Sequence, residues 1–186
     1  MSIAKCTVFT SGLKGAEAAF GEEAVKWGQD ECVLTFAGHQ LDRPDAKNVV
    51  TLSEEELQRG DISMELVSRM MHRTYYGADK IRKVLQAIFH VLNRGHQVLV
   101  VGTIMEDNTV KGGTGWAVEL AKLFNRPLSV FDQQRGKWYL WQGGIWQEDK
   151  PRITYDTLAC SGTRNLTDSG RQAIADLFNE AFGNKG

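Results

Sequence analysis

The chain has 186 residues, of which 42% are hydrophobic and 24% are charged, and its formal net charge is −1. This length predicts a single domain over residues 1–186 with a substantial hydrophobic core, and the near-neutral charge does not favour nucleic acid as a partner. The sequence has no apolar run of about 18 residues and no apolar leader, so we expect a cytoplasmic protein without a membrane segment.

The cysteines and histidines give no sign of a metal site or of a disulfide framework. Cys6, Cys32 and Cys160 are far apart, and each lies in or beside an apolar, strand-like run. Such cysteines usually behave as small hydrophobic side chains, and their spacing fits neither paired disulfides nor a zinc motif. The four histidines form no ligand cluster with them. We therefore expect no metal, no cofactor and a reducing compartment.

The first half of the chain alternates strand-like and helix-like segments. The spacing of apolar residues predicts strand 6–9, helix 16–27, strand 32–36, a short strand 49–51, a helix that begins at a capping box at 53–56, and helices 62–75 and 79–93. The last of these helices carries its apolar residues in one stripe, and Gly95 follows it as a C-terminal cap.

The second half begins with residues 97–101, a continuous apolar run typical of a central strand that is buried on both faces. The following pattern predicts a helix at 115–125, a strand at 128–131, an aromatic hairpin at 137–147, a strand at 157–160 and a final helix from 167 or 168 to 182. We expect the hairpin aromatics to pack on the core; a stacking wall for a base, or a homodimer contact, are alternatives.

Strands that alternate with helices predict an α/β fold, with a mainly parallel sheet and helices on both faces. Ligands of such sheets lie beyond the carboxyl ends of the strands. Three strand-to-helix turns are rich in glycine, serine or threonine, at 10–15, 111–115 and 161–164. If their strands are parallel, the three turns meet at one edge, and one ligand can contact more than one of them.

The second of these turns is the most informative segment of the sequence. Gly112, Gly113, Thr114 and Gly115 follow an apolar strand and open a helix. Glycines let the backbone approach a ligand closely, and the first turn of a helix supplies unpaired N–H groups and a partial positive charge. Together these features predict an anion site, most often for phosphate. We therefore expect the chain to bind a nucleotide or another phosphorylated small molecule.

The other two turns contribute further binding candidates. Ser11, Gly12 and Gly15 lie in the first turn and are candidates for contacts with phosphate or ribose. Arg164 lies in a Gly-Thr-Arg turn after the last strand, where its guanidinium could pair with a phosphate. The sequence therefore predicts a ligand site assembled from several turns.

The glycine segment also resembles the signature of a known family. Gly112-Gly-Thr-Gly-Trp-Ala-Val-Glu119 is similar to the P-G-G-x-G-T-x-x-E motif of the Lonely Guy proteins, which are nucleoside-monophosphate phosphoribohydrolases. Ile81-Arg-Lys-Val84 resembles the Arg–Lys pair that this family carries on the helix before its central strand. The wider group is the SLOG superfamily, which also includes molybdenum-cofactor carrier proteins and DNA-processing protein A. The resemblance implies a Rossmann-like three-layer sandwich.

The resemblance also implies roles for individual residues. Arg82 and Glu119 would be the catalytic pair of an enzyme of this type. Arg82 would pair with phosphate or stabilise transition-state charge, and Glu119 would contact ribose hydroxyls or stabilise an oxocarbenium-like centre during N-glycosidic cleavage. Lys83 would assist in ligand binding.

The sequence departs from the enzymes at three places. Lys111 stands where they have proline, Trp116 where they have threonine, and residues 103–110 form an extra stretch before the glycines. These departures leave the function open between hydrolysis of a nucleoside 5′-monophosphate and non-catalytic binding. In the second case the protein would sequester or sense a nucleotide, a cyclic nucleotide or a cofactor. Binding of single-stranded DNA, as in DNA-processing protein A, is the least favoured alternative.

Overall fold

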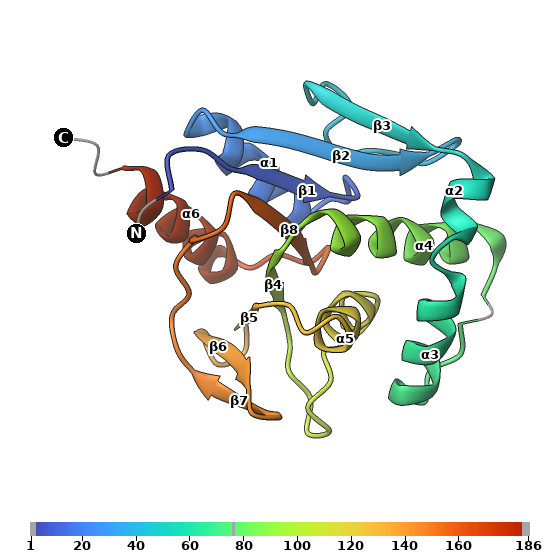
Figure 1. Cartoon of the computed structure of the whole chain (residues 1–186). Helices are drawn as coiled ribbons and strands as arrows, with labels where there is room; N and C mark the ends of the chain where they lie inside the picture. Colours follow the sequence, from blue (N-terminus) through green and yellow to red (C-terminus); the bar gives the residue numbers. More distant parts are fainter. Residues whose placement is uncertain (1–2, 76, 184–186) are drawn as a thin grey trace.

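Within residues 3–75 and 77–183, which the computed structural model describes, eight strands form one sheet (Figure 1). The strands are β1 (Thr7–Thr10), β2 (Asp30–Phe36), β3 (Asn48–Leu52), β4 (Gln97–Gly102), β5 (Leu128–Asp132), β6 (Lys137–Gln142), β7 (Ile145–Glu148) and β8 (Thr157–Gly162). The helices are α1 (Ala16–Lys26), α2 (Glu54–Gln58), α3 (Asp61–Met71), α4 (Asp79–Arg94), α5 (Thr114–Leu123) and α6 (Asp168–Phe182).

The strand order is β3-β2-β1-β8-β4-β5-β6-β7, and the strands from β3 to β5 run parallel. The hairpin of β6 and β7 continues the sheet in antiparallel fashion beyond β5. β8 comes last in the sequence but lies between β1 and β4 (Figure 1). The chain therefore runs outward from this centre in both directions, which places a switch point in strand order at the carboxyl ends of β1, β8 and β4.

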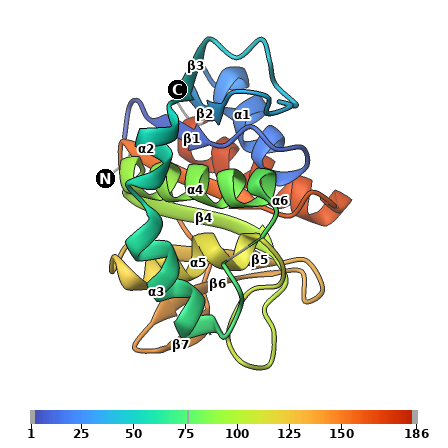
Figure 2. The ribbon, with the colours of Figure 1, turned by 90° about the vertical axis from the view of Figure 1, so that its right-hand side faces the viewer.

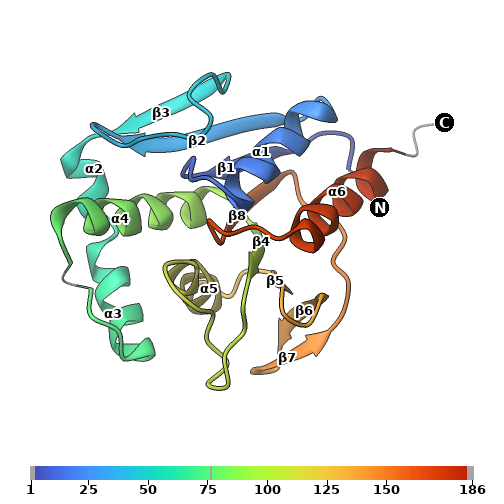
Figure 3. The same ribbon diagram turned by 180° about the vertical axis from the view of Figure 1, so that it is seen from behind.

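Helices cover both faces of the sheet. α1 and α6 lie together on one face (Figure 3), where Phe20 and Phe178 are fully buried. α4 and α5 cover the other face, where Leu92 and Leu120 are fully buried. α2 packs against α4, and α3 packs against α5 (Figure 2). This arrangement confirms the expected α/β sandwich with a mainly parallel sheet. No helix in the described ranges is both long and apolar enough to span a membrane.

The strand pattern explains which parts of the sheet are central. All six residues of β4 are buried, as the continuous apolar run predicts for a strand covered on both faces. The weakly apolar segment at 48–52 forms β3, which is an edge strand of the sheet, and most of its side chains are exposed or half-buried. The burial of each strand therefore follows its place in the sheet.

The structure differs from the expected elements in the connection before α4. The helix predicted at 62–75 ends at Met71, because His72 adopts the left-handed conformation with a φ of 56°. The chain beyond it returns to the core, where Tyr75 is buried and its hydroxyl donates to Asp61. The helical pattern suggested a longer helix, but the buried side chain of Tyr75 holds the connection between α3 and α4 against the core.

The aromatic hairpin packs on the core, as expected, but it is an edge of the main sheet and not a separate one. Trp138 is buried against Phe131 of the neighbouring strand, with ring centroids 5.5 Å apart. Trp141 and Trp146 face each other across the hairpin, with ring centroids 4.9 Å apart. The hairpin therefore extends the hydrophobic core beyond β5.

We expect Gly162→Ala to destabilise the protein by about 1–3 kcal/mol, because the added Cβ would overpack the contact between α1 and β8. It would lie 2.5 Å from the Cβ of Ala16 and 2.6 Å from the carbonyl oxygen of Val101. Urea denaturation measures the loss. Gly77→Ala is the control, because its added Cβ would come no closer than 3.5 Å to another element's atoms. Unchanged stability of Gly162→Ala would contradict this close packing.

Candidate functional site

A pocket of about 520 Å³ opens at the carboxyl edge of the central strands. Three turns contribute to its lining, namely those that follow β1, β4 and β8, and the aliphatic face of α4 forms one wall. The pocket thus lies at the switch point in strand order, where parallel α/β sheets bind their ligands. The structure brings together all three turns that the sequence singled out.

The glycine turn before α5 presents open backbone to this pocket. Gly112 and Gly113 are exposed and line the pocket with Thr114, the first residue of α5. A Cβ at Gly112 or Gly113 would meet no atom within 4 Å, so packing does not require a glycine at either position. Gly112 has a φ of 73°, which favours glycine for conformational reasons. The free space beside the first turn of α5 leaves room for an anion.

Gly115 has a different role from the other two glycines. A Cβ there would lie 2.1 Å from the carbonyl oxygen of Val110 and 2.5 Å from Nη1 of Arg73. Gly115 therefore lets the preceding loop and an arginine approach the helix, and it does not line the pocket.

Arg73, which the sequence analysis did not select, holds the loop that precedes the glycines. Its Nη1 donates to the carbonyl oxygen of Gly112 at 3.0 Å, and its Nη2 donates to the carbonyl oxygen of Val110 at 3.0 Å and to Oγ1 of Thr109 at 3.1 Å. Charge-assisted hydrogen bonds of this kind are stronger than neutral ones. A lone arginine between two helices carries no sequence signal for this long-range contact.

The tip of the same loop is held from the other side by the aromatic hairpin. Nε1 of Trp146 and Nζ of Lys122 each donate to the carbonyl oxygen of Asn108 at 3.0 Å. Nζ of Lys122 also lies 3.9 Å from the ring centroid of Trp141, within the range of a cation–π contact. The extra stretch at 103–110 is therefore attached to two separate parts of the molecule.

The structure does not bring the two catalytic candidates together at the pocket. Glu119 is buried on α5 and pairs with Nζ of Lys122 at 2.8 Å. Arg82 lies 3.3 Å from a carboxylate oxygen of Asp61, and its guanidinium lies 4.2 Å from the ring centroid of Tyr75. Within the described chain, the pocket lining includes neither Arg82 nor Glu119.

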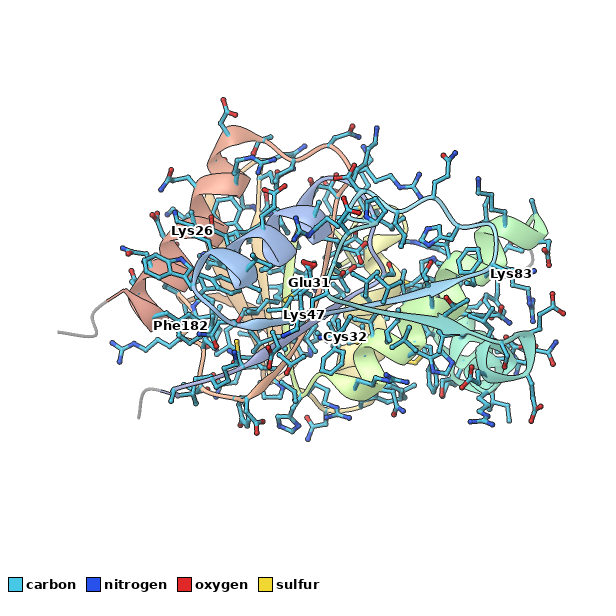
Figure 4. The ribbon with its side chains drawn as sticks, turned by 90° about the horizontal axis from the view of Figure 1, so that it is seen from above. Lys26, Glu31, Cys32, Lys47, Lys83 and Phe182 are labelled. Carbon is cyan, nitrogen blue, oxygen red and sulfur yellow. The ribbon has the colours of Figure 1, made fainter. Side chains whose placement is uncertain are left out.

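Lys83 also lies away from the pocket lining. Its Nζ pairs with Glu54 at 3.1 Å and with Asp79 at 3.3 Å. Figure 4 shows Lys83 at the end of the molecule opposite Lys26 and Phe182, where α2 and the beginning of α4 meet. These ion pairs are exposed and contribute little to stability.

The turn after β1 supports the site through packing. Gly15 has a φ of 87°, and a Cβ there would lie 2.4 Å from the carbonyl oxygen of Thr163 and 2.7 Å from that of Arg164. Gly12 has a φ of 76°, and a Cβ there would lie 2.7 Å from side-chain atoms of Leu41. Both glycines therefore place the turn against its neighbours, whereas Arg164 itself is exposed and lines the pocket.

Glu17, which the sequence analysis also did not select, is a buried carboxyl group in the lining of the pocket. Its side chain accepts hydrogen bonds on Oε1 from the backbone N–H and the hydroxyl of Ser11, at 2.7 and 2.8 Å. Oε2 is buried and has no hydrogen-bond partner among the described residues. Burial raises the pKa of Glu17 to about 7, although the bonds from Ser11 and the charge of Arg164 oppose this rise.

Comparison with known proteins confirms the fold. The chain matches the crystal structure of a protein from Syntrophus aciditrophicus SB described as "Putative molybdenum carrier protein", with a TM-score of 0.57 and 15% identity. The match covers 98% of this chain and 97% of that one. No protein-family model and no curated protein matches the sequence. The match confirms the expected α/β fold and its likeness to the fold of a protein described as a molybdenum carrier, which is all that a match at this identity establishes.

We expect Arg73→Gln to loosen the loop at 103–110 and to destabilise the protein by roughly 1–3 kcal/mol, because charged hydrogen bonds to the loop are lost. Hydrogen exchange at the amide of Lys111, which donates to the carbonyl oxygen of Thr103 at 3.0 Å, should become faster. Arg69→Gln, an exposed position on the preceding helix, serves as the control. An unchanged exchange rate at Lys111 in Arg73→Gln would show that the loop does not depend on Arg73.

We expect Glu17→Gln to be more stable than the wild type at pH 8 by up to about 3 kcal/mol, at 1.36 kcal/mol per pKa unit. The folded-state pKa of Glu17, about 7, lies above its ordinary value of 4.5, so the folded protein holds this proton more tightly than the unfolded chain. Stability of the wild type therefore falls as pH rises from 4.5 to 7, and the two proteins converge at lower pH. Urea denaturation across this range measures the difference. Glu22→Gln, on an exposed face of the same helix, is the control, and parallel profiles of wild type and Glu17→Gln would refute the argument.

Proposed function

We propose that the protein binds a nucleotide-like phosphorylated small molecule in this pocket and does not turn it over. The observation that carries the proposal is the two-sided lining of the pocket. One side is an open glycine turn at the start of α5, with cationic side chains nearby, and the other side is an aliphatic wall from α4. A ligand that suits both sides has an anionic end and an apolar, flat end.

The anionic end fits the glycine turn. The helix dipole favours negative charge at this end of α5, where the N–H groups of Gly115 and Trp116 donate to the carbonyl oxygens of Gly112 and Gly113 at 3.1 Å. Lys111 and Arg164 are exposed and line the pocket, so both contribute positive charge to it. A phosphate accepts several hydrogen bonds at once.

The apolar end fits the wall formed by α4. Ile81, Val84, Leu85 and Ile88 all line the pocket, and Ile81 remains 58% exposed. A large exposed aliphatic side chain beside a polar turn is a natural surface for a heterocyclic ring. The volume of about 520 Å³ also lies within the range of roughly 300–1,000 Å³ that is typical of small-molecule sites.

Two observations favour binding over hydrolysis. Glu119, the carboxylate that the family resemblance implies for N-glycosidic cleavage, pairs with Lys122 and is not among the residues that line the pocket. Arg82 is engaged with Asp61. The carrier description of the Syntrophus protein agrees with capture without turnover, and it makes molybdate a useful second anion to test.

The proposal predicts that at least one nucleoside monophosphate raises the melting temperature of the protein and is recovered intact. AMP, GMP, CMP and UMP form the panel, with inorganic phosphate and molybdate as probes of the anion end alone. Thermal shift and calorimetry measure binding, and chromatography of the bound fraction detects free base. Absence of binding by every monophosphate would refute the proposed function, and release of free base would refute the absence of turnover.

A pair of variants locates the anion. Gly113→Glu places a carboxylate at the open turn and Gly113→Gln places a neutral group of the same size there; a Cβ at this position meets no atom within 4 Å. We expect the glutamate variant to bind the best monophosphate at least roughly tenfold more weakly than the glutamine variant, because like charges repel. Equal affinities would place the phosphate elsewhere.

A further inference from the structure

Glu17 combines features that neither packing nor the phosphate site explains. Its carboxyl group is buried in the pocket lining, and burial makes its ionisation costly. Ser11 satisfies Oε1 with two hydrogen bonds, whereas Oε2 has no partner among the described residues. A buried polar atom without a partner costs free energy. A neutral apolar side chain would fill the position without this cost, so packing alone does not account for the carboxyl group.

Oε2 of Glu17 is buried, and it has no hydrogen-bond partner among the described residues. Arg164, in the turn after β8, favours the ionised carboxylate electrostatically and lowers its pKa. From β8 itself, the buried thiol of Cys160 faces the same region, and Glu17 is one of the causes that raise the pKa of this thiol. Ser11 is the neighbour from the end of β1.

Two other glutamates, on α1 and on the neighbouring strand β2, form ion pairs, although Oε1 of Glu31, like Oε2 of Glu17, is buried without a hydrogen-bond partner among the described residues. Glu22, on the outer part of α1, pairs with Arg171 of α6 at 3.2 Å. Glu31 of β2 pairs with Arg43 at 2.7 Å. The ionisation of Glu17 is therefore governed by burial, by Ser11 and by Arg164.

Glu17, at the start of α1, lies away from the anion end of the pocket, because the strands that precede the two sites are not neighbours in the sheet. Glu17 follows β1, the glycine turn follows β4, and β8 lies between these two strands. Neighbouring strands are about 4.8 Å apart, so the two ends of the site lie on the order of 10 Å from each other. A phosphate at the glycine turn thus leaves a different part of the same ligand beside Glu17.

We propose that Oε2 of Glu17 accepts a hydrogen bond from an N–H group on the heterocyclic ring of the bound molecule, at the end of the pocket remote from the phosphate. This inference rests on the proposed function and narrows the ligand class. The ligand would be a phosphorylated molecule whose base carries a hydrogen-bond donor. An ionised carboxylate accepts only, so it selects against bases that present no donor.

The test compares monophosphates that differ in their donors. GMP, IMP and AMP each carry an N–H or amino group on the base, and purine riboside 5′-monophosphate carries none. Calorimetry at pH 8, where the Glu17 carboxyl is ionised, should show that at least one of the first three binds roughly tenfold or more tightly than purine riboside 5′-monophosphate. Equal affinity of all four would overturn the inference while leaving the proposed function intact, and absence of binding by all four, and by CMP and UMP as well, would refute both.

Glu17→Gln supplies the second arm. The amide oxygen can still accept from Ser11, while the amide N–H₂ replaces Oε2 and reverses its polarity. We expect the variant to lose the preference for bases with donors, whereas Glu22→Gln keeps it. Loss of one negative charge strengthens binding of every phosphate to Glu17→Gln, so the readout is the affinity of each base relative to purine riboside 5′-monophosphate in the same protein. A preference that survives in Glu17→Gln would overturn the inference.

The same pair of proteins fixes the sign of the pH dependence. A ligand donor favours the ionised carboxylate, so the tenfold preference of the wild type should decline as pH falls from 8 to 6, through the folded-state pKa of about 7. The phosphate of the ligand titrates near pH 6 as well. Glu17→Gln shares that contribution, so the ratio of the two affinities isolates Glu17. A ratio that does not change with pH would contradict the proposed hydrogen bond.

Discussion

The site depends on the contact between the turn after β1 and the turn after β8. Gly15 lies against the carbonyl oxygens of Thr163 and Arg164, at distances that no side chain would permit, and the backbone N–H of Ala16 donates to the carbonyl oxygen of Thr163 at 3.0 Å. This contact fixes the start of α1 on the last strand. It also sets Glu17, one residue further along, and Arg164 on the same side of the sheet's edge.

The three glycines of the turn before α5 have two different roles, one in the pocket and one in packing. Gly112 and Gly113 leave open space beside the first turn of α5, whereas Gly115 admits Arg73 and the carbonyl group of Val110. A motif of three glycines in the sequence therefore serves two purposes in the fold. The distinction appears only when the neighbours of each missing Cβ are known.

Local patterns were enough to predict the alternation of strands and helices, the buried central strand and the glycine turn, because these features depend on residues close together in the sequence. They also predicted the three turns that meet at the pocket. They could not place β8 between β1 and β4, since strand order depends on pairing between distant segments. For the same reason no local pattern indicates that Arg73 and Trp146 contact the loop at 103–110.

The candidate site was predicted less completely than the fold. The family resemblance directed attention to Arg82, Lys83 and Glu119, which pair with side chains outside the pocket lining. Glu17 was not selected because a glutamate in the first turn of a helix is common and favourable on its own. Its burial follows from the packing of α1 on β8, which places the first turn of α1 against the turn that follows β8.

The loop at 103–110 has a consequence for how a ligand enters. Arg73 on one side and Trp146 on the other attach it to elements that are themselves part of the core. The loop, of which Thr103 lines the pocket, is thus held in place before a ligand binds, and little conformational entropy is lost there on association. The affinity of such a site depends on how well the ligand fits the lining of the pocket, because this loop need not rearrange when a ligand binds or leaves.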